Sequence, residues 1–269
     1  MCLQLAQQLL QLDGIGASVP VPFADMVANV SNGSSVYHGL TANLRKRFSN
    51  HFQFLASYTW SHTIDDALDL QATLEPQNNY RPDLERSNST FDQRHRFVFS
   101  GVYQTGRVAG GNLKSKVLSD WTFAPIIQIA SGQPFNIISG VDQNFDFSTP
   151  TDRPRVVPGG TPVSSCGDPA APSPFSPTGL LQPACFLDGT LTGNLGRNAG
   201  TKPWTLFNDL RVARRIRLTE RLALDGMVDI FNIANRFNAA DVNPLWDQQG
   251  VPTAAFDPRQ IQLALKLSW

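Results

Sequence analysis

Apolar and polar residues alternate one by one near the end of the chain. A repeat of two is typical of a β-strand whose faces meet two different environments. The stretch covers residues 259–269, and its length matches the roughly 9–11 residues that cross a bilayer as a tilted strand. One face would carry Ile261, Leu263, Leu265, Leu267 and Trp269, and the other Gln260, Gln262, Ala264, Lys266 and Ser268.

The same alternation recurs upstream and predicts further strands. Strands in soluble sheets usually have about 5–6 residues, so these segments are long for a soluble sheet. Their polar faces carry Arg, Asp, Gln and Ser, whereas their other faces are apolar and end in aromatic residues. The predicted strands are 36–48, 52–60, 96–103, 121–129, 206–216 and 222–230, with a weaker one at 23–30.

The connections between these segments alternate between short and long. The short ones are 49–51, 105–118 and 218–220, and the long ones are 65–94, 132–203 and 235–258. Outer-membrane barrels have short periplasmic turns and longer extracellular loops. We therefore predict an all-β protein, an antiparallel up-and-down transmembrane β-barrel segment of about eight long strands. Residues 1–22 would be a poorly structured remnant, and residues 23–269 the C-terminal portion of the barrel.

Composition and charge narrow the class of protein. Charged residues make up 16% of the chain, compared with about 25% in typical soluble domains. No run of about 20 apolar residues is present, so a helical membrane protein is not expected. The 22 basic and 22 acidic residues cancel. Without a basic stripe, nucleic acid is not an expected partner.

The beginning of the chain does not resemble a secretory signal. No Lys or Arg precedes Arg45, and glutamines interrupt the apolar residues. A signal peptide needs a basic region before an apolar core. Either the protein stays in the cytoplasm or the sequence is a piece of a longer chain, and the strand pattern favours the second.

Two groups of residues have expected positions in such a barrel. Aromatic side chains gather at both membrane interfaces, which is the position expected for Trp60, Tyr103, Trp121 and Trp269. Polar side chains of the other face line the lumen. Arg211, Asp225 and Asp229 should face the lumen of adjacent strands and could form ion pairs there.

We expect structural roles for the remaining candidate residues. Cys166 and Cys185 lie in one Pro/Gly/Ser-rich segment, which suits a loop disulfide in an oxidising compartment, with two free thiols as the alternative. Asp65, Asp66 and Asp69 lack the ordered spacing of a calcium loop, so a solvated loop is expected. His95 lies between two arginines with no nucleophile beside it, as in a cationic patch at the membrane interface. No metal, cofactor or catalytic residue is predicted.

Four segments of the chain resemble a known family. They are SSVYHGLTANLRKRFSNHFQFLASYTWSHTIDD (34–66), FDQRHRFVFSGVYQ (91–104), RIRLTERLALDGMVDIFNIANRFN (215–238) and QIQLALKLSW (260–269). In this order they resemble strands of the Oar-like TonB-dependent transporters. The resemblance covers about residues 20–269.

The resemblance implies a location and a set of partners. Such transporters have a barrel of about 22 strands, an internal plug and an N-terminal segment that contacts TonB. The chain would then be the last third of a barrel in the outer membrane, and not an enzyme. Its partners would be membrane lipid, an unknown ligand, and the barrel-assembly machinery through the strand ending at Trp269. TonB would be reached only through regions outside the sequence.

Two alternatives remain open. The first is an adhesin or another non-transporting surface protein built on the same wall. The second is a soluble all-β enzyme, such as a carbohydrate-active one, in which paired carboxylates do the chemistry. Loops 65–94 and 132–203 are where a ligand would bind, because outward loops meet a solute first.

Overall fold

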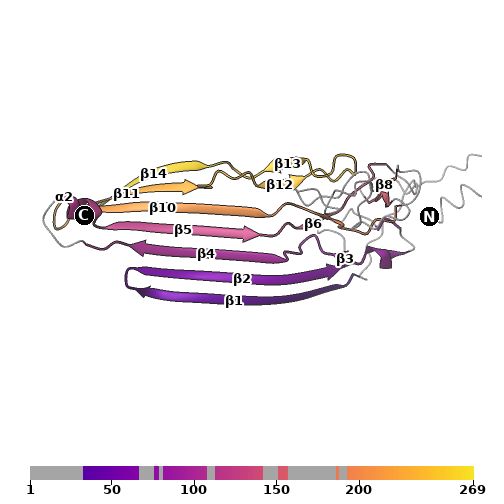
Figure 1. The fold of residues 1–269 in the computed structure, drawn as a ribbon, viewed down its shortest axis with the longest axis horizontal. Coiled ribbons are helices and arrows are strands. Elements are labelled where there is room, and N and C mark those ends of the chain that lie inside the picture. Colours follow the sequence, from indigo (N-terminus) through magenta and orange to yellow (C-terminus); the bar gives the residue numbers. More distant parts are fainter. Residues whose placement is uncertain are drawn as a thin grey trace, which may run out of the picture.

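The fold is a single large antiparallel sheet with its strands in chain order (Figure 1). The computed structural model describes residues 33–66, 76–78, 81–107, 113–141, 151–156, 186–187 and 193–269. Each long strand pairs with the next long strand along the chain, which is the up-and-down topology expected. The long strands are β1 (Ser35–Ser49), β2 (Phe52–Asp65), β4 (His95–Gln104), β5 (Trp121–Ala130), β10 (Thr205–Arg217), β11 (Ala223–Phe231) and β14 (Gln260–Ser268).

The eighth strand of this sheet differs from the one expected. It is β3 (Ser87–Asn88), a two-residue strand that pairs with the end of β2. The weaker strand predicted at residues 23–30 lies outside the described residues, as does the remnant predicted at 1–22. The alternation of the sequence thus predicted all seven long strands, and their ends differ from the predictions by only a few residues.

The strand register places the apolar residues on one continuous face. Residues directly opposite each other in an antiparallel pair point to the same side of the sheet. The pairs Leu40–Trp60, Phe99–Ile127, Phe123–Val212 and Val228–Leu263 therefore share a face across the whole sheet. We call this the apolar face, and the opposite one, with Arg211 and Asp229, the polar face.

The apolar face is not covered by other parts of the described chain. Leu263 is 74% exposed and Leu265 is 76% exposed, near the middle of β14. The only buried apolar residues of the long strands are the two small ones, Ala130 and Ala223. Side chains of this kind would normally pack into a core, so the apolar face needs an apolar environment outside the protein.

The two ends of the sheet differ, and we name them by their connections. At the turn end, β1 and β2 are joined through Asn50 and His51, whose φ angles of 51° and 72° suit a tight hairpin turn. Residues 218–222 connect β10 to β11 at the same end, near the C-terminus (Figure 1). No helix of the described ranges is long and apolar enough to cross a membrane.

The third connection at the turn end contains a helix that the sequence pattern did not predict. This helix, α2 (Leu113–Leu118), lies between β4 and β5. The indole Nε1 of Trp121 donates a 2.7 Å hydrogen bond to the carbonyl oxygen of Val117. The aromatic residue at the start of β5 thus fixes the end of the helix.

The loop end holds the short elements and most of the buried apolar side chains. Phe135, Ile137, Leu195, Ala239 and Val242 are buried there, in the connections between the long strands. The protein therefore packs its own small core at the loop end. The short elements are η1 (Pro82–Glu85), β6 (Pro134–Phe135), β7 (Arg155–Val156), β8 (Phe186–Leu187), β9 (Gly200–Thr201), β12 (Ala239–Val242) and β13 (Pro252–Ala255).

The two outermost strands of the sheet are paired on one side only. Within the described residues, β1 hydrogen-bonds to β2 alone and β14 to β11 alone. Figure 1 shows these two strands at opposite edges of the sheet. The described sheet is therefore open and does not close on itself.

Candidate functional site

Ion pairs connect neighbouring strands on the polar face. Arg211 on β10 lies directly opposite Asp229 on β11. Its Nε donates to Oδ1 at 2.6 Å, and its second nitrogen donates to Oδ2 at 2.8 Å. Further along the same strands, Arg215 lies 3.7 Å from the carboxylate of Asp225.

A third strand, β14, adds a basic side chain to the charged residues of the polar face. Lys266 on β14 is the register partner of Asp225, and Gln262 is the partner of Asp229. In the row of Arg215, Asp225 and Lys266 the charges alternate in sign across the three strands. The structure thus places Arg211, Asp225 and Asp229 together on the face opposite the apolar one, and joins Arg211 to Asp229.

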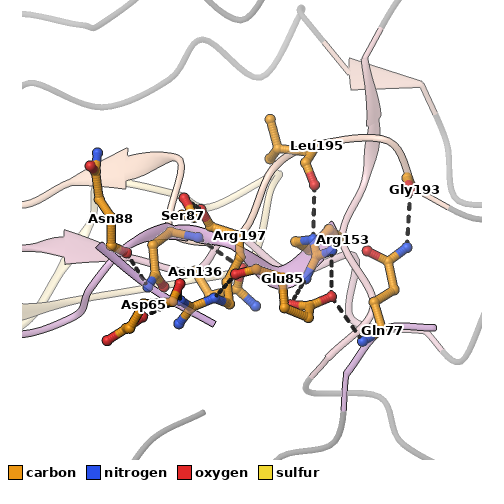
Figure 2. Close-up of polar contacts among 11 residues, drawn as sticks. Asp65, Gln77, Glu85, Ser87, Asn88, Asn136, Arg153, Gly193, Leu195 and Arg197 are labelled. Carbon is orange, nitrogen blue, oxygen red and sulfur yellow. Dashed lines mark hydrogen bonds and ion pairs between the residues drawn. The ribbon is translucent and has the colours of Figure 1, made fainter. Parts of the chain in front are cut away.

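A second group of charges is buried at the loop end (Figure 2). Arg153 donates to both carboxylate oxygens of Glu85, at 2.8 and 2.9 Å, and its Nε donates to the carbonyl oxygen of Leu195 at 2.8 Å. The Arg153 and Glu85 side chains are only 5% and 2% exposed. This bidentate ion pair matches the planar geometry of the guanidinium to that of the carboxylate.

Arg197 forms the second half of the same cluster. Its Nε donates to the backbone carbonyl of Glu85 at 2.6 Å. Its second nitrogen donates to the backbone carbonyl of Asp65 at 2.7 Å and is paired with the Asp65 carboxylate. One guanidinium thus joins the end of β2 to η1.

Neutral side chains complete the cluster. The Gln77 amide donates to the carbonyl oxygen of Gly193 at 3.0 Å, and its backbone N–H donates to Glu85 at 3.2 Å. The Asn198 amide donates to the carbonyl oxygen of Asn88 at 2.8 Å. We define the loop-end cluster as Asp65, Gln77, Glu85, Ser87, Asn88, Asn136, Arg153, Gly193, Leu195, Arg197 and Asn198.

The loop-end cluster joins the connection after β2 to separate parts of the connection between β5 and β10. Removing one partner of a buried ion pair leaves a charge without compensation, which costs about 3–5 kcal/mol. Such a cluster therefore fixes the loops relative to the sheet. The Ser87 hydroxyl donates to the carbonyl oxygen of Arg197, and the two carboxylates of the cluster are occupied by arginines.

The four aromatic residues predicted at the membrane interfaces lie at two levels along the strands. Tyr103 pairs in register with Phe123 near the turn end, and Trp121 stacks on Phe123 at 6.2 Å. Trp60 lies toward the loop end, opposite His95. Trp269 follows β14 at the turn end and is 91% exposed.

The distance between the two aromatic levels suits a membrane. Phe52 and Trp60 are eight positions apart on β2 and pair with Tyr103 and His95. At about 3.4 Å per residue they are separated by roughly 27 Å along the strand. With the usual strand tilt this is about 20 Å of height, close to the apolar band of an outer-membrane barrel.

The remaining candidates take part in local contacts. Asp65 belongs to the loop-end cluster, and Asp66 lies 3.8 Å from Arg86. His95 Nδ1 lies 2.8 Å from the Tyr58 hydroxyl, whereas Arg94 pairs with Asp92 at 3.0 Å. Within the described ranges, no group of three or more His, Cys, Asp and Glu residues could hold a metal ion. Asp69, Cys166 and Cys185 lie outside these ranges.

The loop-end cluster was not predicted from the sequence. The only signal is that Glu85, Arg153 and Arg197 are charged residues within loops that contain Pro or Gly. That signal marks charged loop residues, but it does not identify which of them pair.

The fold and its two faces define an outer-membrane β-barrel protein. A family model described as an outer membrane beta barrel domain matches residues 6–262. The chain belongs to this family, and its location is the outer membrane. No curated protein and no solved structure matches the sequence.

The family membership gives the two ends of the sheet a direction. In such barrels the short turns face the periplasm and the long loops face outward. The turn end is therefore periplasmic and the loop end extracellular. The apolar face contacts lipid, and the polar face lines the interior.

Proposed function

We propose that this chain forms wall, lumen surface and extracellular loops of a TonB-dependent outer-membrane receptor that takes up a ligand. The observation that carries the proposal is the open sheet. Within the described residues, the outer edges of β1 and β14 pair with no other strand, and unpaired backbone groups are not tolerated in hydrocarbon. The sheet therefore needs further strands beside it, as in a barrel of about 22 strands.

The polar face supports the same proposal. A wide barrel encloses an aqueous interior that must either conduct solutes or be plugged. The ion pair between Arg211 and Asp229 presents a hydrated, charged wall to that interior. Such a wall suits contact with a separate polar plug.

The loops around the loop-end cluster are the proposed entrance for ligand. Binding residues are often placed on loops that a rigid scaffold holds in position. The pairs of Glu85 with Arg153 and of Asp65 with Arg197 provide this rigidity. The proposed role is therefore binding and passage of a solute, with no chemical reaction.

The last strand has a second proposed role. β14 carries the alternating pattern through Leu267 and is followed by the exposed Trp269 at the turn end. An unpaired strand edge is a template for pairing with another chain. We infer that the barrel-assembly machinery contacts this edge during insertion.

The test of the proposal uses the whole gene product from its source cells. The coding sequence upstream of Met1 is determined, and the full protein is tested for binding to a purified periplasmic domain of TonB. The expected result is an upstream plug-coding region and specific binding. A separate start without a plug, together with no TonB binding, would contradict transport and favour the surface-protein alternative.

A further inference from the structure

Two asparagines build a rigid turn after β11. Asn232 and Asn235 both have φ near +49°, a conformation that Asn tolerates better than most residues. The Asn232 side chain accepts from the backbone N–H of Arg236 at 3.0 Å and donates to its carbonyl oxygen at 2.9 Å. We call residues 232–236 the asparagine turn.

The asparagine turn is attached to the adjacent strand β10. The backbone N–H of Asn232 donates to the Asp209 carboxylate at 2.9 Å. The backbone N–H of Ile233 donates to the carbonyl oxygen of Asn208 at 2.8 Å. The backbone of Arg236 is therefore held by its hydrogen bonds to the Asn232 side chain, and Asn232 is itself held by β10.

The side chain of Arg236 stacks on an aromatic ring at the edge of the apolar face. Its Cζ atom lies 3.5 Å from the ring centroid of Trp204. Trp204 directly precedes β10 and stands two residues before Leu206, which belongs to the apolar face. Trp204 is 48% exposed, and Phe237 next to Arg236 is 65% exposed. This position corresponds to the outer membrane interface.

A second arginine is held by the same turn. The backbone N–H of Arg259 donates to the side-chain oxygen of Asn235 at 3.2 Å. Arg259 directly precedes β14 and stands two residues before Ile261 of the apolar face. The two arginines therefore lie on neighbouring segments at the same end of the sheet.

Neither arginine is paired with an acidic side chain of the described residues. Among the described residues, no ion pair joins Arg236 or Arg259 to a carboxylate. Asp241 is paired with Lys202 at 2.8 Å, and the Asp209 carboxylate accepts from the asparagine turn. Asp257 contacts the turn through its backbone carbonyl, 3.4 Å from the Asn232 amide.

We propose that Arg236 and Arg259 bind the phosphate of a lipid headgroup in the outer leaflet. A guanidinium offers several donors that match the oxygens of a phosphate. Aromatic side chains at a membrane interface sit at the level of the headgroups. Trp204 therefore places the charge of Arg236 at the depth where lipid phosphates lie, and the asparagine turn fixes the backbone of Arg259 at the same end of the sheet.

The proposal is tested with the full chain refolded in an uncharged detergent. Phosphatidic acid and phosphatidylcholine with the same acyl chains are added separately, and retained lipid is measured by native mass spectrometry. The test variant is Arg236→Gln with Arg259→Gln. The control is Arg45→Gln with Arg47→Gln, which removes two exposed arginines from the polar face of β1.

Preferential retention of phosphatidic acid is expected for the unchanged chain and for the control. The test variant should lose on the order of tenfold in apparent affinity, since each basic residue contributes to attraction of an anionic headgroup. Equal retention by the test variant, or an equal loss in the control, would overturn the proposal. Complete displacement by equimolar inorganic phosphate would show a free-anion site and overturn the lipid assignment.

A single substitution keeps the test decisive if the double variant does not fold. Arg259→Gln leaves the stacked pair of Arg236 and Trp204 intact. The guanidinium that it removes forms no ion pair in the described part of the chain. Retention of phosphatidic acid should fall several-fold, and unchanged retention would contradict the proposal. The result does not depend on whether the barrel transports anything.

Discussion

The guanidinium of Arg153 donates to both carboxylate oxygens of Glu85, at 2.8 and 2.9 Å, and both side chains are almost fully buried. We predict that Glu85→Gln will destabilise the packed loops by about 3–5 kcal/mol, because it leaves the buried charge of Arg153 uncompensated. The measurement is hydrogen exchange of residues 193–201 in the folded chain. These residues should lose protection while the long strands keep theirs.

A control for this prediction lies two residues away. Asp83 is paired with Arg81 at 2.8 Å, but both side chains are about 60% exposed. Exposed pairs contribute little to stability, so Asp83→Asn should leave the protection of residues 193–201 unchanged. Equal effects of the two substitutions would show that burial of the Glu85 pair is unimportant.

Gly193 of the loop-end cluster should not tolerate a side chain. A Cβ atom on Gly193 would lie 1.5 Å from the carbonyl oxygen of Arg153, so the backbone would have to shift. Gly193→Ala should therefore loosen the loops, with a loss of protection similar in place to that of Glu85→Gln. In Gly196→Ala the new atom meets nothing within 4 Å, so limited proteolysis should distinguish the two variants. Identical cleavage would argue against the close approach.

The two faces of β14 should respond differently to charge. Leu265 is 76% exposed on the apolar face, whereas Ala264 points to the polar face. In lipid vesicles, Leu265→Arg should cost about 2–4 kcal/mol because a cation near the bilayer midplane is poorly solvated. Ala264→Arg should cost much less. Reversible urea unfolding followed by tryptophan fluorescence gives both values, and a larger cost at Ala264 would reverse the assignment of the faces.

Acid should weaken one contact of the extracellular loops. The hydrogen bond from the Lys202 ammonium lowers the pKa of the Asp241 carboxyl below its usual value. Because the folded pKa is the lower one, the contact stabilises the fold above the unfolded pKa of about 3.9 and is lost as the pH falls through the folded value. Hydrogen-exchange protection factors of the β12–β13 hairpin should therefore decrease at acidic pH.

Asp241→Asn should remove this pH dependence. Asp247→Asn provides the matched control, since it removes an exposed carboxylate from the same connection without breaking an ion pair of the described residues. A pH dependence that persists in Asp241→Asn and disappears in Asp247→Asn would assign the effect to the wrong carboxylate.

The long strands of the sheet could be predicted from the sequence because each strand depends on the local alternation of apolar and polar residues. Alternation of period two identifies both the strands and their faces, as for Leu263 and Leu265 against Gln262 and Ala264. The short turns predicted the order of pairing, since neighbouring strands in a meander pair with each other. The helix α2 was missed because six residues in a Gly-containing link give too short a pattern to recognise.

The loop-end cluster could not be predicted in the same way. Arg153 and Glu85 are 68 positions apart, and Arg197 and Asp65 are 132 apart. No periodic pattern connects residues at such separations, and a charged residue in a loop is usually solvated. Only the folded arrangement of several connections shows which charges meet.

The separation between the apolar face and the packed loop end has a consequence for handling the protein. The apolar face is solvated by the surrounding lipid, whereas side chains such as Ile137 and Leu195 are buried by the protein itself. Exchanging lipid for detergent therefore perturbs the first region far more than the second. The packed loops at the loop end should therefore stay ordered in detergent micelles in which the strands of the sheet have already lost part of their order.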